Sequence, residues 1–137
     1  MTIYTSYFAR VKKLQECGLN NLVCVAGYAP KFYFDTPHAR FMPELAPKRC
    51  WWLVWHNKFK DNPNSPESID WYKNIYLDTV LSKLNPYNVL EKLGDNAVML
   101  CYEKPGDFCH RHLIADWLST NTDAKVSEIP NIIDQIP

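Results

Sequence analysis

The sequence has little glycine, no net charge and no long apolar run. Only four of its 137 residues are glycine, and 15 Lys and Arg side chains balance 15 Asp and Glu. A formal net charge of +0 at pH 7 gives no overall attraction to duplex nucleic acid or to an anionic membrane. No apolar stretch approaches the roughly 20 residues of a membrane span, and no basic segment with an apolar core opens the chain. These absences disfavour duplex nucleic acid and membranes as partners.

The cysteines lack the spacing of a disulfide framework. There are five of them, at positions 17, 24, 50, 101 and 109, and no two form a CxxC pair. We therefore expect reduced thiols and a cytoplasmic location. Aromatic residues, in contrast, are plentiful, with five Trp, eight Tyr and six Phe. This composition predicts an aromatic-rich core or pocket.

Strand-like and helix-like segments alternate along the chain. Apolar and β-branched runs predict strands over 2–6, 22–26, 97–102 and 124–129. Helical spacing predicts helices over 7–16, 66–84, 86–93 and from 110 onward. Strands separated by helices imply right-handed crossovers. We predict one domain over 1–137 of the α/β class, with a small, mostly parallel sheet of three to four strands and helices on its faces, in a Rossmann-like three-layer arrangement.

Two helix starts carry a capping residue followed by proline. Ser65-Pro66 and Asn85-Pro86 each combine a side-chain acceptor for free N–H groups with a residue suited to the first helical position. Two other segments lack a clear period. Residues 28–48 contain four prolines, and we predict a long loop of the kind that forms a lid or binding loop. Residues 50–59 are rich in Trp and suit a strand or a helix, of which we favour the helix.

The most informative segment is the corner between the strand at 97–102 and the helix that follows. Cys109, His110 and Arg111 stand together at the start of that helix. A helix N-terminus directs unpaired N–H groups and a positive dipole end at its surroundings. Such a place suits an anion, and it also depresses the pKa of a thiol. We expect this corner to be part of any chemical site.

The same corner resembles the signature of the domain of unknown function 488 family. The resemblance rests on the segment Leu-Cys-Tyr-Glu-Lys-Pro-Gly-Asp-Phe-Cys-His-Arg-His-Leu-Ile-Ala over 100–115. Further similarity follows in the same order at 5–9, 29–30 and 45–47 and in the helix that contains Tyr72 and Tyr76. The resemblance covers most of the chain and implies a small α/β domain without a settled activity.

A ligand site is predicted at the carboxyl ends of the strands. In an open parallel sheet, ligands bind at this edge, where residues far apart in sequence converge. The predicted ligand-binding residues are Thr5, Ser6, Tyr7, Gly27, Tyr28, His110 and Arg111, and the candidate catalytic residues are Cys109 and Glu103. Hydroxyl groups, backbone N–H groups and an arginine suit a phosphate or carboxylate. We therefore predict a small anionic or nucleotide-like ligand, with Arg111 and the helix N-terminus as its anion holder.

The chemistry at this corner has alternatives. Cys109 can act as a nucleophile or serve only in packing, and Glu103 can act as a base, bind a ribose hydroxyl or pair with Arg111. His110 and His112, together with Cys109 or Cys101, are candidate metal ligands. Because the two histidines lie two apart on a helix and point to different faces, we predict no metal site. The sequence identifies no cofactor and no oligomeric state.

Two other functions compete with ligand binding or catalysis. One is a non-catalytic interaction or ligand-sequestering module that uses the loop over 28–48 and the cluster of Trp51, Trp52 and Trp55. The other is a nucleic-acid-modifying protein, which the neutral charge disfavours.

Overall fold

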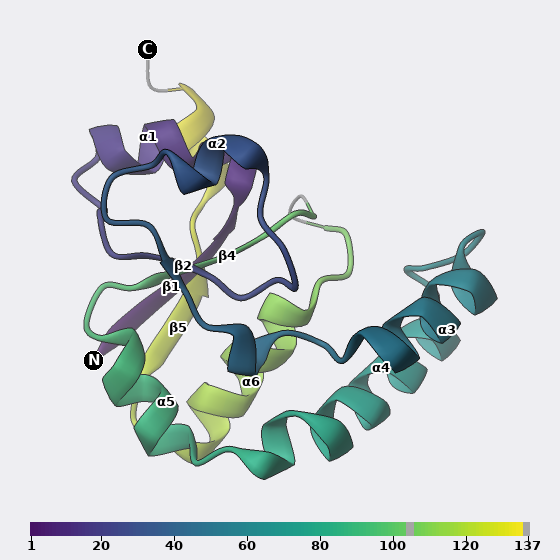
Figure 1. Cartoon of the computed structure of the whole chain (residues 1–137). Coiled ribbons are helices and arrows are strands. Elements are labelled where there is room, and N and C mark those ends of the chain that lie inside the picture. The colour runs from purple at the N-terminus through teal and green to yellow at the C-terminus, as the bar shows by residue number, and fades with distance from the viewer. Residues whose placement is uncertain (104–105, 136–137) are drawn as a thin grey trace.

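The chain folds around one five-stranded parallel sheet, shown in Figure 1. The computed structural model describes residues 1–103 and 106–135. The strands lie in the order β3-β2-β4-β1-β5, and every neighbouring pair is parallel. Their bounds are β1 Thr2–Tyr7, β2 Leu22–Cys24, β3 Arg40–Phe41, β4 Val98–Cys101 and β5 Lys125–Glu128. The predicted α/β class and Rossmann-like three-layer arrangement are confirmed.

Helices cover both faces of this sheet. Their bounds are α1 Val11–Glu16, α2 Lys31–Phe34, α3 Arg49–Phe59, α4 Pro66–Thr79, α5 Pro86–Leu93 and α6 His110–Asn121. Short 3-10 turns join them at Phe8–Arg10, Pro43–Leu45, Leu81–Lys83 and Asn131–Gln135. In Figure 1, α1 and α2 lie on one side of the sheet, while α5 and α6 lie on the other. α3 and α4 run side by side and extend beyond the sheet as a helical hairpin.

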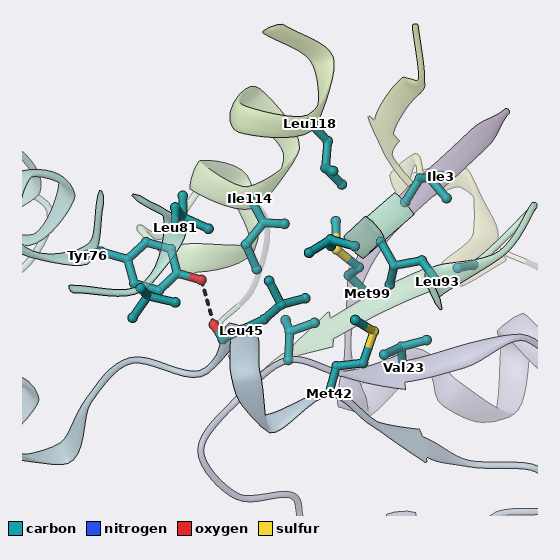
Figure 2. Close-up of a cluster of buried hydrophobic side chains, with 14 of the residues drawn as sticks. Ile3, Val23, Met42, Leu45, Tyr76, Leu81, Leu93, Met99, Ile114 and Leu118 are labelled. Carbon is teal, nitrogen blue, oxygen red and sulfur yellow. Dashed lines mark hydrogen bonds between the residues drawn. The ribbon is translucent and has the colours of Figure 1, made fainter. Parts of the chain in front are cut away.

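Each face of the sheet has its own core. Val98 and Leu100 of β4 belong to the cluster on the α1 side, whereas Met99 belongs to the cluster beneath α6. Because β4 is buried on both faces, its residues are all apolar, which explains the unbroken apolar run over 97–101. Figure 2 shows Ile114 and Leu118 of α6 packing over Met99.

One buried hydrogen bond links α4 to the segment before α3. The Tyr76 hydroxyl donates to the Leu45 carbonyl at 2.5 Å (Figure 2). Because Tyr76 is fully buried, this bond satisfies a polar group that the core would otherwise leave without a partner. It joins α4 to the 3-10 turn Pro43–Leu45, which leads from β3 to α3.

The predicted capping signals are confirmed. Ser65 Oγ accepts from the Ser68 N–H at 3.2 Å, and Asn85 Oδ1 accepts from the Tyr87 N–H at 2.9 Å. Gly94 follows α5 with φ of +81°, a conformation that side chains disfavour. The favoured helix over 50–59 is also confirmed as α3.

Residues 28–48 differ from the predicted loop. They contain α2, a 3-10 turn and the two-residue edge strand β3, which adds a fifth strand to the predicted three to four. β3 is too short to produce a period in the sequence. Tertiary bonds hold it, because Arg40 of β3 donates to the Leu93 carbonyl at 2.5 Å and to Asn21 Oδ1 at 2.6 Å.

Two positions of the corner motif, Lys104 and Pro105, lie outside the described residues. Within 1–103 and 106–135, no helix has both the length and the apolar character needed to cross a membrane.

Candidate functional site

A cavity of about 360 Å³ opens at the carboxyl ends of β2 and β4. Its floor comes from the residues that follow these strands and from the start of α6. Its outer wall comes from α3, α4 and the segment leading into α3. Aromatic side chains dominate the lining, namely Tyr28, Trp52, Trp55, Tyr72, Tyr102 and Phe108. The polar lining consists of Arg49, Glu103, His110 and the thiols of Cys101 and Cys109.

The aromatic wall is held in place by contacts among its own members. Trp55 Nε1–H donates to Ser68 Oγ at 3.0 Å, and its ring meets Tyr72 edge-on at a centroid distance of 5.0 Å. Tyr72 in turn contacts Phe108 at 4.8 Å. Burial raises the pKa of Tyr72 well above its usual range, so this phenol stays neutral. The wall therefore presents uncharged aromatic surface to the cavity.

Asn64 connects the helical hairpin to the corner before α6. Its Oδ1 accepts from the Phe108 N–H at 2.8 Å. Asn64 stands in the turn between α3 and α4, so one bond joins that turn to the cavity floor. Its position in a polar turn is the only signal in the sequence that pointed to it.

Two helices begin at this cavity. Arg49 is the first residue of α3, and Cys109 and His110 are the N-cap and first residue of α6. Neither N-cap residue, Lys48 or Cys109, caps its helix with a side-chain hydrogen bond. The N–H groups of a first helical turn have no acceptor within the helix, and the helix dipole adds partial positive charge there. The cavity therefore combines aromatic walls with two positive helix ends.

The structure divides the predicted site residues into two groups. Gly27, Tyr28, Glu103, Cys109 and His110 line the cavity together. The remaining predicted residues, Thr5, Ser6, Tyr7 and Arg111, are not among its lining residues.

Ser6 and Tyr7 lie outside the cavity lining. Ser6 is fully buried, and its Cα pairs with that of Leu100 inside the sheet. The Arg10 guanidinium lies over the Tyr7 ring, 4.7 Å from its centroid. Neither placement gives these residues access to a ligand in the cavity.

Arg111 and Thr5 meet through a residue that the sequence did not single out, Glu128 of β5. Arg111 donates to Glu128 from Nε and Nη2, each at 3.1 Å, and to the Glu103 carbonyl from Nη1 at 2.7 Å. Thr5 Oγ1 donates to the same Glu128 carboxylate. Desolvation lowers the pKa of the buried Arg111, and the hydrogen bond to Glu128 raises it. The net result is a raised pKa, so the guanidinium stays charged.

The Arg111 guanidinium is fully buried and its donors are turned to protein acceptors. We therefore do not retain Arg111 as the holder of a ligand anion. The open cation at the cavity is Arg49 instead.

Cys109 has a different environment from the one expected at a helix N-terminus. Its side chain is 4% exposed, and burial raises the pKa of its thiol well above the usual range. The expectation of a depressed thiol pKa is wrong because desolvation and the neighbouring Cys101 both raise the pKa of Cys109, and His110 lowers it by less. In the protein alone, Cys109 is a protonated thiol at neutral pH.

Cys101, Cys109 and His110 form a compact buried cluster in the cavity floor. One ligand atom from each lies within 4.8 Å of the other two. His112, which we had considered beside His110, lies in the lining of a separate cavity with Asn64 and Asp116. The sequence spacing correctly separates the two histidines. Cys101, which the sequence offered as a candidate ligand, lies beside His110 across the corner.

Several cavity residues were absent from the predicted site, namely Arg49, Trp52, Trp55, Tyr72, Tyr102 and Phe108. The prediction placed the site from the ends of the strands. It missed the outer-wall residues because these belong to helices that extend beyond the sheet. Lys48-Arg49 after Pro47, at a helix start, is the signal that was available for Arg49.

Comparison with protein-family models, curated proteins and solved structures finds no match for this chain. The resemblance to the domain of unknown function 488 family stays a prediction.

Proposed function

We propose that the protein binds a mononucleotide-like ligand, a planar ring carrying an anionic group, in the cavity at the carboxyl ends of β2 and β4. The observation that carries the proposal is the meeting of aromatic walls, two helix N-termini and Arg49 around one cavity. The predicted catalytic roles of Cys109 and Glu103 are not needed for binding.

The aromatic lining supports a planar ring as one part of the ligand. Tyr28 is 69% exposed and makes a tilted contact with Tyr102 at a centroid distance of 5.3 Å, so it offers ring surface at the cavity mouth. Trp52 stacks on His56 at 4.9 Å and 10°, which holds its indole plane in one orientation. Rings favour offset-stacked or edge-on contacts with such side chains. A heterocyclic base fits this chemistry.

The entrance to α3 supports an anionic group as the other part. Arg49 is exposed, and within the described residues no hydrogen bond or ion pair engages its guanidinium. The free N–H groups of the first turn of α3 lie beside it. An arginine next to a helix N-terminus suits phosphate because both charge-assisted bonds and the dipole favour it.

The size of the cavity supports a small ligand. Its volume of about 360 Å³ lies near the lower end of the roughly 300–1,000 Å³ typical of ligand pockets. A mononucleotide or nucleoside suits this space better than a dinucleotide.

Glu103, at the exposed rim, is suited to accept hydrogen bonds from sugar hydroxyls.

The test is titration calorimetry with AMP, GMP, CMP and UMP, and with adenosine and inorganic phosphate as ligands that carry only one part each. We expect at least one nucleotide to bind more tightly than its nucleoside. Arg49→Gln should weaken nucleotide binding by about 10–100-fold, the equivalent of one charged hydrogen-bonding group, and leave adenosine binding little changed.

Lys60→Gln is the matched control, because Lys60 is exposed at the other end of α3. It removes the same charge from the same helix, and we expect unchanged affinities. The proposal fails if no nucleotide binds at millimolar concentration, or if Arg49→Gln and Lys60→Gln behave alike.

A further inference from the structure

Three metal-ligand side chains converge at the corner between β4 and α6. Cys101 is the last residue of β4, Cys109 is the N-cap of α6 and His110 is its first residue. All three are buried, at 3%, 4% and 6% exposure. The two thiols and the imidazole come from positions eight and nine residues apart in the sequence, and the fold brings them together.

The orientation of the His110 ring is set by its second nitrogen. His110 Nε2 lies 2.7 Å from the Val25 carbonyl oxygen. A carbonyl only accepts hydrogen bonds, so Nε2 carries the proton, and in the neutral ring Nδ1 has a free lone pair. Nδ1 faces Cys101 Sγ at 3.6 Å and Cys109 Sγ at 3.9 Å. Metal-binding histidines almost always fix their other nitrogen in this way, often on a backbone carbonyl.

The two sulfur-to-nitrogen separations are close to those of a tetrahedral site, and all three ligand atoms lie within 4.8 Å of one another. A zinc ion with bonds of about 2.3 Å to sulfur and about 2.0 Å to nitrogen places these ligand atoms roughly 3.5 Å apart. The observed Sγ–Nδ1 separations of 3.6 and 3.9 Å are close to that length. Cys101 Sγ also lies 3.2 Å from Glu103 Oε2, so a carboxylate oxygen is available for the fourth position.

We propose that Cys101, Cys109 and His110 Nδ1 bind one Zn²⁺ ion, with Glu103 or a ligand in the cavity at the fourth position. Thiolate and imidazole ligands select zinc among the common divalent ions. Binding releases the two thiol protons to solvent, and the resulting thiolates share their charge with the ion. All three ligands line the cavity, so the fourth position opens into it. This site does not depend on the nucleotide proposal.

The first test uses the unaltered protein, purified without chelators and with any affinity tag removed. We expect about one zinc ion per chain by inductively coupled plasma mass spectrometry. After the metal is removed under reducing conditions, Co²⁺ should produce the visible bands of a tetrahedral site and a thiolate-to-cobalt charge-transfer band, which Zn²⁺ then abolishes. An octahedral cobalt spectrum without charge transfer would overturn the proposal.

Site variants separate ligands from neighbours. Cys109→Ser and His110→Gln should each weaken zinc binding by more than about 100-fold, beyond the 10–100-fold typical of changing an outer-shell partner. Cys50→Ser and His112→Gln are matched controls outside the cluster and should bind zinc as the unaltered protein does. Equal affinities for Cys109→Ser and Cys50→Ser would contradict the site.

A third measurement does not require a folded variant. Bound Zn²⁺ should slow alkylation of Cys101 and Cys109 in the unaltered protein and leave Cys17 unaffected, as read by peptide mass spectrometry. If zinc changes none of these rates, or if the isolated protein contains a disulfide between Cys101 and Cys109 and no metal, the proposal is wrong.

Discussion

Within residues 1–103 and 106–135, Arg111 is a charged residue whose side chain is fully buried. It keeps that charge because the Glu128 carboxylate and the Glu103 carbonyl accept its hydrogen bonds, and Thr5 donates to the same carboxylate. These contacts tie α6 to β5 and to the end of β4. Arg111 therefore positions the cavity floor from behind.

Removing the partner of this buried charge should be costly. We expect Glu128→Gln to lower the free energy of unfolding by about 2–3 kcal/mol, somewhat below the usual cost of breaking a fully buried pair because Glu128 is 23% exposed. Urea denaturation at pH 7 measures this change. Glu91→Gln, on the exposed side of α5, is the control and should stay within roughly 0.5 kcal/mol of the unaltered protein.

Among the elements, the hairpin of α3 and α4 shows what the tryptophan cluster does. Trp51 is 7% exposed, contacts Tyr72 edge-on at 4.9 Å and donates from Nε1 to Thr79 Oγ1 at 2.9 Å. Trp55 is bonded to Ser68 in the same interface. Trp51 and Trp55 therefore join the two helices, and the buried Trp51 does not contribute to an exposed Trp surface. The interaction module stays an alternative prediction.

Truncation at this interface should therefore destabilise the fold. We expect Trp51→Ala to lower the free energy of unfolding by about 3–5 kcal/mol, the range for large buried aromatic residues. Leu53→Ala, on the exposed side of the same helix, should change it by less than about 0.5 kcal/mol. If the two variants were equally stable, Trp51 would not belong to the core.

A second pair of elements, the 3-10 turn Phe8–Arg10 before α1 and the last 3-10 turn, is joined by a pH-sensitive contact. Arg10 donates to both Asp134 oxygens, at 3.1 and 2.8 Å, and this bonding holds the pKa of Asp134 below its ordinary value of 3.8. A carboxylate with a lowered folded-state pKa stabilises the fold above the unfolded pKa. That contribution is lost as the pH falls through the folded value.

Asp134→Asn should consequently reduce stability at pH 7 and have progressively less effect as the pH drops below about 4. Thermal unfolding of both proteins across this pH range measures the difference. A gap in melting temperature that stays constant between pH 7 and pH 3 would show that the charge of Asp134 does not act through Arg10.

For the molecule as a whole, local signals located most of the sheet and its helices. Ser65-Pro66 and Asn85-Pro86 predicted the starts of α4 and α5, because N-capping depends only on adjacent residues. β3 could not be predicted from the sequence, because a strand of two residues shows no alternation of apolar and polar side chains. Its position depends on the hydrogen bond from Arg40 to the Leu93 carbonyl of α5.

The candidate site was predictable only where it follows the strands. Gly27, Tyr28 and Glu103 could be placed at the cavity because parallel strands share one carboxyl edge. The outer wall was not predictable, because the angle at which α3 and α4 leave the sheet is set by tertiary contacts such as the bond between Tyr76 and Leu45. Burial was also not visible in the sequence, and it pairs Arg111 with Glu128 and raises the pKa of the Cys109 thiol.

The most direct test of nucleotide binding is a two-dimensional ¹H–¹⁵N NMR titration with AMP, read at the backbone amides and the five tryptophan side chains. The account predicts that the indole signals of Trp52 and Trp55 shift together with the amides of Gly27, Tyr28 and Arg49, since these residues line the cavity. The indole signals of Trp71 and Trp117 should stay in place. Shifts confined to another surface, or no shifts at millimolar AMP, GMP, CMP and UMP, would contradict it.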